Sequence, residues 1–146
     1  MDIQTFQPDV RRNHADRYLV VVTLAEVSEK LGEPVRVVYT NNMNPGAIAG
    51  NHYHKHKREC FRSAHGRMEV HLVDINTQER RVVVLDADPE SSDHLCLIVP
   101  AGVAHAVRNI GADIARLDVY ATDEPRKPSD DFAFPVLKAA EGPSEG

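Results

Sequence analysis

The sequence lacks the residues and patterns that mark several large classes of protein. It contains no tryptophan and two cysteines, Cys60 and Cys96, which form no CxxC pattern. We therefore expect neither a disulfide framework nor an oxidising compartment. No apolar run approaches the roughly 20 residues that a membrane-spanning helix needs, and the polar N-terminal stretch has no apolar signal-peptide core. These absences favour a cytoplasmic protein that does not associate with membranes.

An excess of positive charge is absent as well. The chain carries 17 Lys and Arg residues against 22 Asp and Glu residues, which gives a net charge of −5. A protein with this balance does not attract nucleic acid through its overall field. We therefore expect no nucleic-acid partner.

Short β-type runs are what the chain has in abundance. The run RMEVHLVD (residues 67–74) alternates apolar and polar side chains, as a strand with one buried face does. Similar runs recur from residue 59 to residue 121, separated by Gly, Asn, Asp, Pro and Ser. Many short strands with turn residues between them predict an all-β sandwich or barrel, and the length of 146 residues suits one domain.

The rest of the chain adds little regular structure. We expect an N-terminal arm over residues 1–17, a single domain over residues 18–137 and a flexible tail over residues 138–146. Near the start of the domain, TLAEVSEKLGEP predicts one short helix, with Thr23 as the N-cap and Gly32 closing the segment.

The stretch HYHKHKRE (residues 52–59) concentrates groups that bind metals. On a strand, His52 and His54 point to the same side, so their rings can converge on one ion. His56 falls in the polar turn that follows, and Glu59 can return a carboxylate to the site after an antiparallel reversal. Taken alone, the stretch is also compatible with a basic hairpin turn that is rich in histidine.

A second stretch, PAGVAHAVRN (residues 100–109), carries His105 on a new strand after a Pro-Gly turn. Together the two stretches resemble the paired signatures of the cupin superfamily. The matching positions are Gly50, His52, His54, Glu59 and Gly66 in the first, and Pro100, Gly102, His105 and Asn109 in the second.

The resemblance implies a double-stranded β-helix, the cupin jelly-roll barrel, with a metal site at its mouth. It makes His52, His54, Glu59 and His105 the ligands of one divalent ion, which would be Zn, Fe, Mn or Ni. Some barrels of this kind, the sugar-nucleotide epimerases among them, use the same pocket for acid–base chemistry without a metal, so this alternative stays open.

The approach segment PGAIAGNHYHKHKRE, the strand DVYATDEP and the later DDFAF resemble the sugar-nucleotide branch of this superfamily, which includes epimerases, ketoisomerases and cupin domains of capsule-synthesis reductases. The resemblance implies an isomerase or epimerase that acts on a sugar nucleotide or a related carbonyl compound. Basic residues around the mouth would suit a small anionic ligand. These residues are Lys55, Lys57, Arg58 and Arg62.

Epimerisation beside a carbonyl needs groups that remove and return a proton. We expect these among His56, Tyr53 and Tyr120, although each can equally be solvated or packed. Two other functions use the same fold: an Fe-dependent dioxygenase and a non-catalytic module that binds a sugar or another small ligand. Barrels of this kind commonly pair through their N-terminal strands, so we also expect a homodimer.

Overall fold

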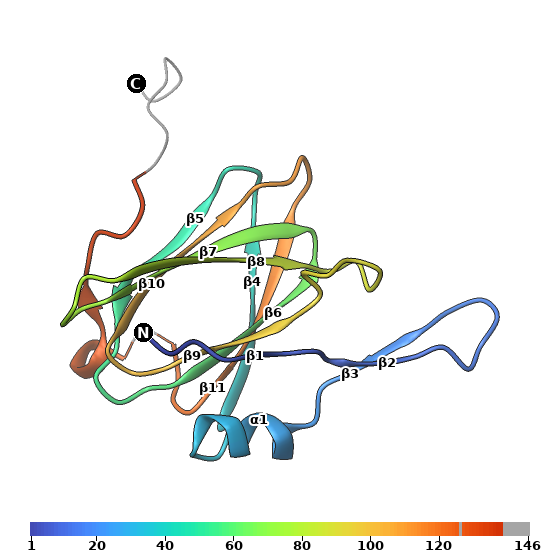
Figure 1. Ribbon diagram of the computed structural model, residues 1–146, viewed down its shortest axis with the longest axis horizontal. Coiled ribbons are helices and arrows are strands. Elements are labelled where there is room, and N and C mark those ends of the chain that lie inside the picture. Colours follow the sequence, from blue (N-terminus) through green and yellow to red (C-terminus); the bar gives the residue numbers. More distant parts are fainter. Residues whose placement is uncertain (126, 139–146) are drawn as a thin grey trace.

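The computed structural model describes residues 1–125 and 127–138, so all but the first residue of the expected tail lies outside the described residues. Its strands form two antiparallel five-stranded sheets, ordered β1–β9–β6–β11–β4 and β12–β5–β10–β7–β8 (Figure 1). The first sheet comprises β1 (Thr5–Phe6), β4 (Val37–Met43), β6 (Glu59–His65), β9 (Cys96–Val99) and β11 (Ala115–Ala121). The second comprises β5 (Ile48–Tyr53), β7 (Arg67–Asp74), β8 (Arg80–Asp86), β10 (Val103–Asn109) and β12 (Phe132–Ala133).

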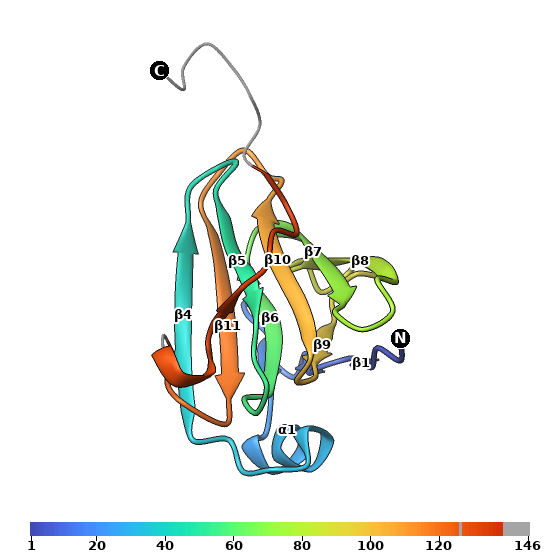
Figure 2. The ribbon, with the colours of Figure 1, turned by 90° about the vertical axis from the view of Figure 1, so that its left-hand side faces the viewer.

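The two sheets face each other and enclose the main core, which confirms the jelly-roll barrel (Figure 2). Met68, Val70 and Leu72 of β7 are fully buried in this core. The residues between them, Glu69 and His71, are partly exposed, as the alternation in the sequence predicts.

The expected α-helix, α1 (Leu24–Leu31), is confirmed with the predicted ends. Thr23 Oγ1 accepts a hydrogen bond from the backbone N–H of Glu26, and Gly32 ends the helix in the left-handed conformation. Val27 and Leu31 pack against the outer face of the first sheet, in a second core cluster. This face of the sheet is therefore buried as well. No helix among the described residues has the length and apolar character needed to cross a membrane.

The N-terminal arm contains short strands. β1 pairs with β9 at the edge of the first sheet. β2 (Asp9–Arg11) and β3 (Leu19–Val21) form a separate two-stranded hairpin that projects from the barrel (Figure 1).

The reversal after the histidine stretch carries the chain from one sheet to the other. β5 lies in the second sheet and β6 in the first, so the intervening residues 54–58 cross from one sheet to the other. The polar turn is real, but it closes the end of the barrel. Because of this crossover, the histidines of β5 and Glu59 of β6 approach each other from facing sheets.

Candidate functional site

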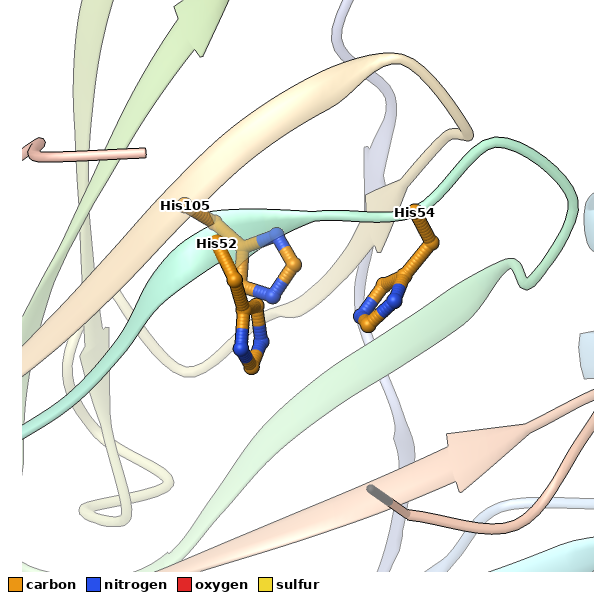
Figure 3. Close-up of side chains that lie close together, drawn as sticks. All are labelled: His52, His54 and His105. Atoms are coloured by element: carbon orange, nitrogen blue, oxygen red, sulfur yellow. The ribbon is translucent and has the colours of Figure 1, made fainter. Parts of the chain in front are cut away.

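Three histidines meet inside the mouth of the barrel. His52 on β5, His54 directly after it and His105 on β10 each offer a ring nitrogen, and these nitrogens lie within 4.8 Å of one another. Their rings face a common space (Figure 3). The ring centroids of His52 and His105 are 4.7 Å apart and those of His52 and His54 are 4.8 Å apart. Residues about fifty positions apart in the chain thus form one cluster.

A β-bulge in β5 sets the orientation of these rings. His105 pairs with His52, but Ala106 pairs with Gly50, so Asn51 is the extra residue. Gly50 and Asn51 both have positive φ, 99° and 60°. A Cβ atom on Gly50 would lie 2.6 Å from the carbonyl oxygen of His105. Only glycine permits this close approach of the two strands beneath the histidines.

Each histidine is held through its Nδ1 atom. His54 Nδ1 lies 2.6 Å from the carbonyl oxygen of Asp130, and His105 Nδ1 lies 3.2 Å from that of Val103. His52 Nδ1 lies 3.1 Å from Asp131 Oδ1. Because these oxygens only accept hydrogen bonds, the Nδ1 atoms carry the protons and the Nε2 atoms present lone pairs. This is the usual arrangement of metal-binding histidines.

Glu59 completes the cluster from the facing sheet. Its Oε1 atom is 3.3 Å from His54 Nε2 and 3.4 Å from His105 Nε2, and all three side chains are buried. Neither Oε1 nor His54 Nε2 has a hydrogen-bond partner in the described part of the chain. Buried lone pairs that face one another require a cation or a proton between them. The donor set of three imidazoles and one carboxylate fits a divalent metal ion such as zinc.

The pKa values of these groups reflect the same crowding. Burial alone would raise the pKa of Glu59, but the adjacent His54 ring and the positive charges around the carboxylate lower it to about 2. Burial lowers the pKa of His105 to about 4. Burial and the charge of His54 also lower the pKa of His52. Burial opposes a charge on His54, yet its contact with Glu59 raises its pKa. Among the three histidines, His54 is therefore the one whose pKa is raised.

The other carboxylate oxygen of Glu59 contacts Tyr39 and Lys57. From the sequence we expected Lys57 as a basic residue at the mouth but did not identify Tyr39. The Tyr39 hydroxyl donates to Oε2 at 3.1 Å, and Lys57 Nζ lies 3.9 Å from it. Burial, and then the charge of Glu59, raise the pKa of Tyr39, so the hydroxyl stays protonated. Alternation along β4 groups Tyr39 with Asn41 and Met43, but the sequence does not show that this group faces the site.

Two adjoining cavities give access to this cluster. An inner cavity of about 60 Å³ reaches His52, Glu59 and His105. An outer cavity of about 460 Å³ is bordered by Lys57, Pro125 and Asp131. Tyr39, Asn41 and His52 line both. The outer volume lies in the range of small-molecule sites.

The structure places two expected catalytic residues elsewhere. Tyr120 packs with Cys60 and Cys96 against α1, on the outer face of the first sheet. The expectation that Tyr120 faces the pocket is therefore wrong, because its neighbours Val119 and Ala121 take the inward positions of β11. Tyr53 points to the outer face of the second sheet, where its ring stacks on Phe132 with centroids 5.2 Å apart.

Two of the expected basic residues also turn away from the mouth. Arg58 Nη1 donates to the carbonyl oxygen of Leu31 at the end of α1. Arg62 Nη2 lies 3.3 Å from Asp118 Oδ2, outside the first sheet. Both alternate with the inward-facing Glu59, and this alternation corrects their placement around the pocket.

The three other expected site residues, Lys55, His56 and Lys57, lie in the turn between β5 and β6 and differ in their exposure. Lys55 and His56 are exposed, and Lys55 Nζ lies 4.5 Å from the centre of the Phe132 ring. Lys57 instead is buried, and its Nζ atom donates to the carbonyl oxygen of Glu124 at 3.3 Å. Of the four basic residues that we expected at the mouth, only Lys57 borders the outer cavity.

Comparison with known proteins identifies the family of this chain. Residues 14–130 match the model of the family described as the polysaccharide biosynthesis C-terminal domain. The chain belongs to this family. No curated protein sequence matches this family member.

Solved structures with similar folds include epimerases and a ketoisomerase, and they establish the RmlC-like cupin fold for this family member. A dTDP-4-dehydrorhamnose 3,5-epimerase from Sulfolobus tokodaii is 15% identical, with a TM-score of 0.72 over 88% of this chain and 74% of the other. A 3,4-ketoisomerase from Helicobacter canadensis is 18% identical, with a TM-score of 0.71 over 89% and 90%. A Bacillus anthracis dTDP-4-dehydrorhamnose 3,5-epimerase with TDP and PPi bound is 18% identical, with a TM-score of 0.73 over 94% and 87%.

Proposed function

We propose that the protein is a metal-dependent isomerase or epimerase that acts on a sugar nucleotide or a closely related carbonyl compound. His52, His54, Glu59 and His105 hold one divalent metal ion. The observation that carries the proposal is the convergence of three histidine nitrogens and Glu59 Oε1 at the inner end of an accessible cavity.

The residues around the cavity suit chemistry next to a carbonyl group. A bound divalent ion supplies a Lewis acid that polarises a carbonyl oxygen. The ammonium group of Lys57 favours negative charge that develops on a substrate oxygen. The Tyr39 hydroxyl, which stays protonated, can donate a proton or a hydrogen bond there. We therefore assign the catalytic roles first expected of His56, Tyr53 and Tyr120 to Lys57 and Tyr39.

Three observations support a sugar-nucleotide substrate. The family is described as a polysaccharide biosynthesis domain, and two enzymes with the same fold are dTDP-4-dehydrorhamnose 3,5-epimerases, one of them with TDP and PPi bound. The outer cavity, at about 460 Å³, is large enough for a small polar molecule. A buried cation, Lys57, borders it, which suits a negatively charged ligand.

The test uses dTDP-4-keto-6-deoxy sugars in D₂O with the protein loaded with zinc, iron, manganese or nickel in turn. Removing an α-proton and returning one from solvent places deuterium on a carbon next to the keto group. We expect mass spectrometry to detect this deuterium with the metal-loaded protein and not with His105→Ala.

The same assay separates the rival functions. Oxygen uptake with iron and no solvent deuterium would identify a dioxygenase. Stabilisation by the sugar nucleotide without deuterium or oxygen uptake would identify a binding module. Full activity after complete metal removal would point to metal-free acid–base chemistry, with His52 and Asp131 as the paired base.

We also propose a homodimer in the cytoplasm. In the described part of the chain, the β2–β3 hairpin pairs with no other strand, and Tyr18 and Leu19 are exposed on it. A two-stranded hairpin is only marginally stable without further support. Sedimentation at micromolar concentration should give twice the monomer mass, and a monomer mass would contradict the dimer.

The two buried free thiols, Cys60 and Cys96, suit the reducing environment of the cytoplasm.

A further inference from the structure

The segment that follows the barrel, residues 128–137, lies along β5, the strand that carries His52 and leads into His54 (Figure 1). Its short strand β12 pairs with β5, with Phe132 opposite Tyr53 and Ala133 opposite His52. We call residues 128–137 the C-terminal segment. Because it is the edge strand next to β5, its contacts act directly on the metal-binding part of the chain.

Asp130 is the centre of this contact. Its side-chain carboxylate is buried and accepts three consecutive backbone N–H groups from the crossover turn. The distances from Lys55 N to Oδ1 and from Lys57 N to Oδ2 are 2.7 Å and 2.8 Å. His56 N lies 3.2 Å from each oxygen. A single carboxylate thereby fixes the backbone between His54 and Glu59.

The backbone of the same residue holds a ligand. The carbonyl oxygen of Asp130 accepts His54 Nδ1 at 2.6 Å, the shortest of the three Nδ1 contacts in the cluster. The conformation of Asp130 therefore sets both the ring orientation of His54 and the path of the turn that follows it. The same turn carries Lys57, whose ammonium group borders Glu59.

Further contacts hold the C-terminal segment in register. The Asn51 side chain, at the bulge, accepts the N–H groups of Val136 and Leu137 through Oδ1 and donates to the Leu137 carbonyl oxygen. The Phe132 ring stacks on the Tyr53 ring and lies 4.5 Å from Lys55 Nζ. The segment is thus anchored to β5 and to the turn by several residues that follow Asp130.

We propose that Asp130 is a positioning residue for the metal site: its carboxylate and its carbonyl oxygen together orient His54 and the turn that leads to Lys57 and Glu59. This inference rests on the proposed metal binding. Outer-shell partners of ligating histidines typically change metal affinity about 10–100-fold when they are removed. Asp130 differs from an ordinary partner because it fixes the turn and the ring at once.

The test is cobalt(II) binding to three forms of the full chain. Wild type is compared with Asp130→Asn, which keeps the shape but turns an amide N–H₂ toward backbone donors. The matched control is Asp74→Asn, since the Asp74 carboxylate also accepts two backbone N–H groups, in the turn that follows β7 and outside the C-terminal segment. Cobalt affinity is measured by chelator competition, and the visible absorption reports the ligand geometry.

We expect Asp130→Asn to weaken cobalt binding at least about 10-fold and to shift the visible absorption, while Asp74→Asn matches wild type in both. An Asp130→Asn protein with wild-type affinity and absorption would overturn the inference and leave the metal site standing. If wild type binds no cobalt, the proposed metal function fails, and the inference fails with it.

Hydrogen exchange on the wild-type protein provides a measurement that no variant can spoil by misfolding. Cobalt should slow amide exchange in residues 55–57 and in the C-terminal segment together, because both are joined to His54 through Asp130. The turn at residues 74–79 should be unaffected. Slowing at residues 55–57 without any change in the C-terminal segment would contradict the positioning role.

Discussion

The two faces of strand β6 show how one strand can serve chemistry and packing at the same time. Its inward residues, Glu59 and Phe61, line the cavity beside the histidines. Its outward residues, Cys60 and Arg62, lie on the face that α1 and Tyr120 cover. Both faces are largely buried, so burial alone does not separate a functional side chain from a structural one. The difference lies in the partners: the inner face gathers buried lone pairs, and the outer face has apolar contacts and the ion pair between Arg62 and Asp118.

The largest expected contrast is between the two tyrosines. Tyr39→Phe removes the hydroxyl that contacts Glu59, and we expect solvent deuterium incorporation to fall about 10²–10⁴-fold, the usual contribution of a general acid. Tyr120→Phe removes a hydroxyl group near Arg62 on the outer face. It should cost about 1 kcal/mol of stability and leave the exchange rate unchanged. Equal losses of activity would show that the two faces are not functionally distinct.

A substitution on the outer face of the first sheet tests whether this face contributes to stability without contributing to metal binding. Leu31, on the buried face of α1, is 3% exposed. Leu31→Ala should lower the free energy of unfolding by about 2–5 kcal/mol, because it leaves a cavity between the helix and the sheet. Urea denaturation measures the loss, and the metal content of the folded protein should stay at the wild-type value. Loss of metal from the folded variant would show that α1 supports the site.

The smallest expected contrast concerns pH. The pKa of His105 falls from 6.5 to about 4 on burial, so between these values the unfolded metal-free chain binds a proton that the folded chain does not. Stability should therefore be complete above pH 6.5 and fall as the pH decreases toward 4, by about 3 kcal/mol for this group. The chelator-treated His105→Gln variant should show a correspondingly flatter profile by urea denaturation. If the stability of the two proteins changed with pH in the same way, the result would contradict the lowered pKa of His105.

The sequence predicted the architecture well because its signals are local. The caps at Thr23 and Gly32 and the alternation of residues 67–74 each depend on neighbouring residues, and the structure confirms them. The candidate metal ligands came from the resemblance to cupins, and the structure brings all four side chains together. Whether they bind a metal remains the proposal to be tested.

The parts that the sequence did not predict depend on long-range placement. Alternation divides a strand into two faces, but it could not show that Tyr39 faces the cavity and Tyr120 faces α1, since both faces are covered. Asp130 and Asp131 follow the last long strand in an irregular segment, where no period indicates their neighbours. The crossover after His54 was not predicted, because the sequence of a polar turn does not specify which sheet receives the next strand.

The most direct test of the account is the metal content of the His52→Ala/His54→Ala double variant, measured beside wild type by elemental analysis after purification. We predict about one divalent ion per wild-type chain and loss of that ion from the double variant. The variant should keep a β-rich circular dichroism spectrum, because the ligands lie at the mouth of the barrel and not in its main core. Unchanged metal stoichiometry in the folded double variant would contradict the assignment of this site.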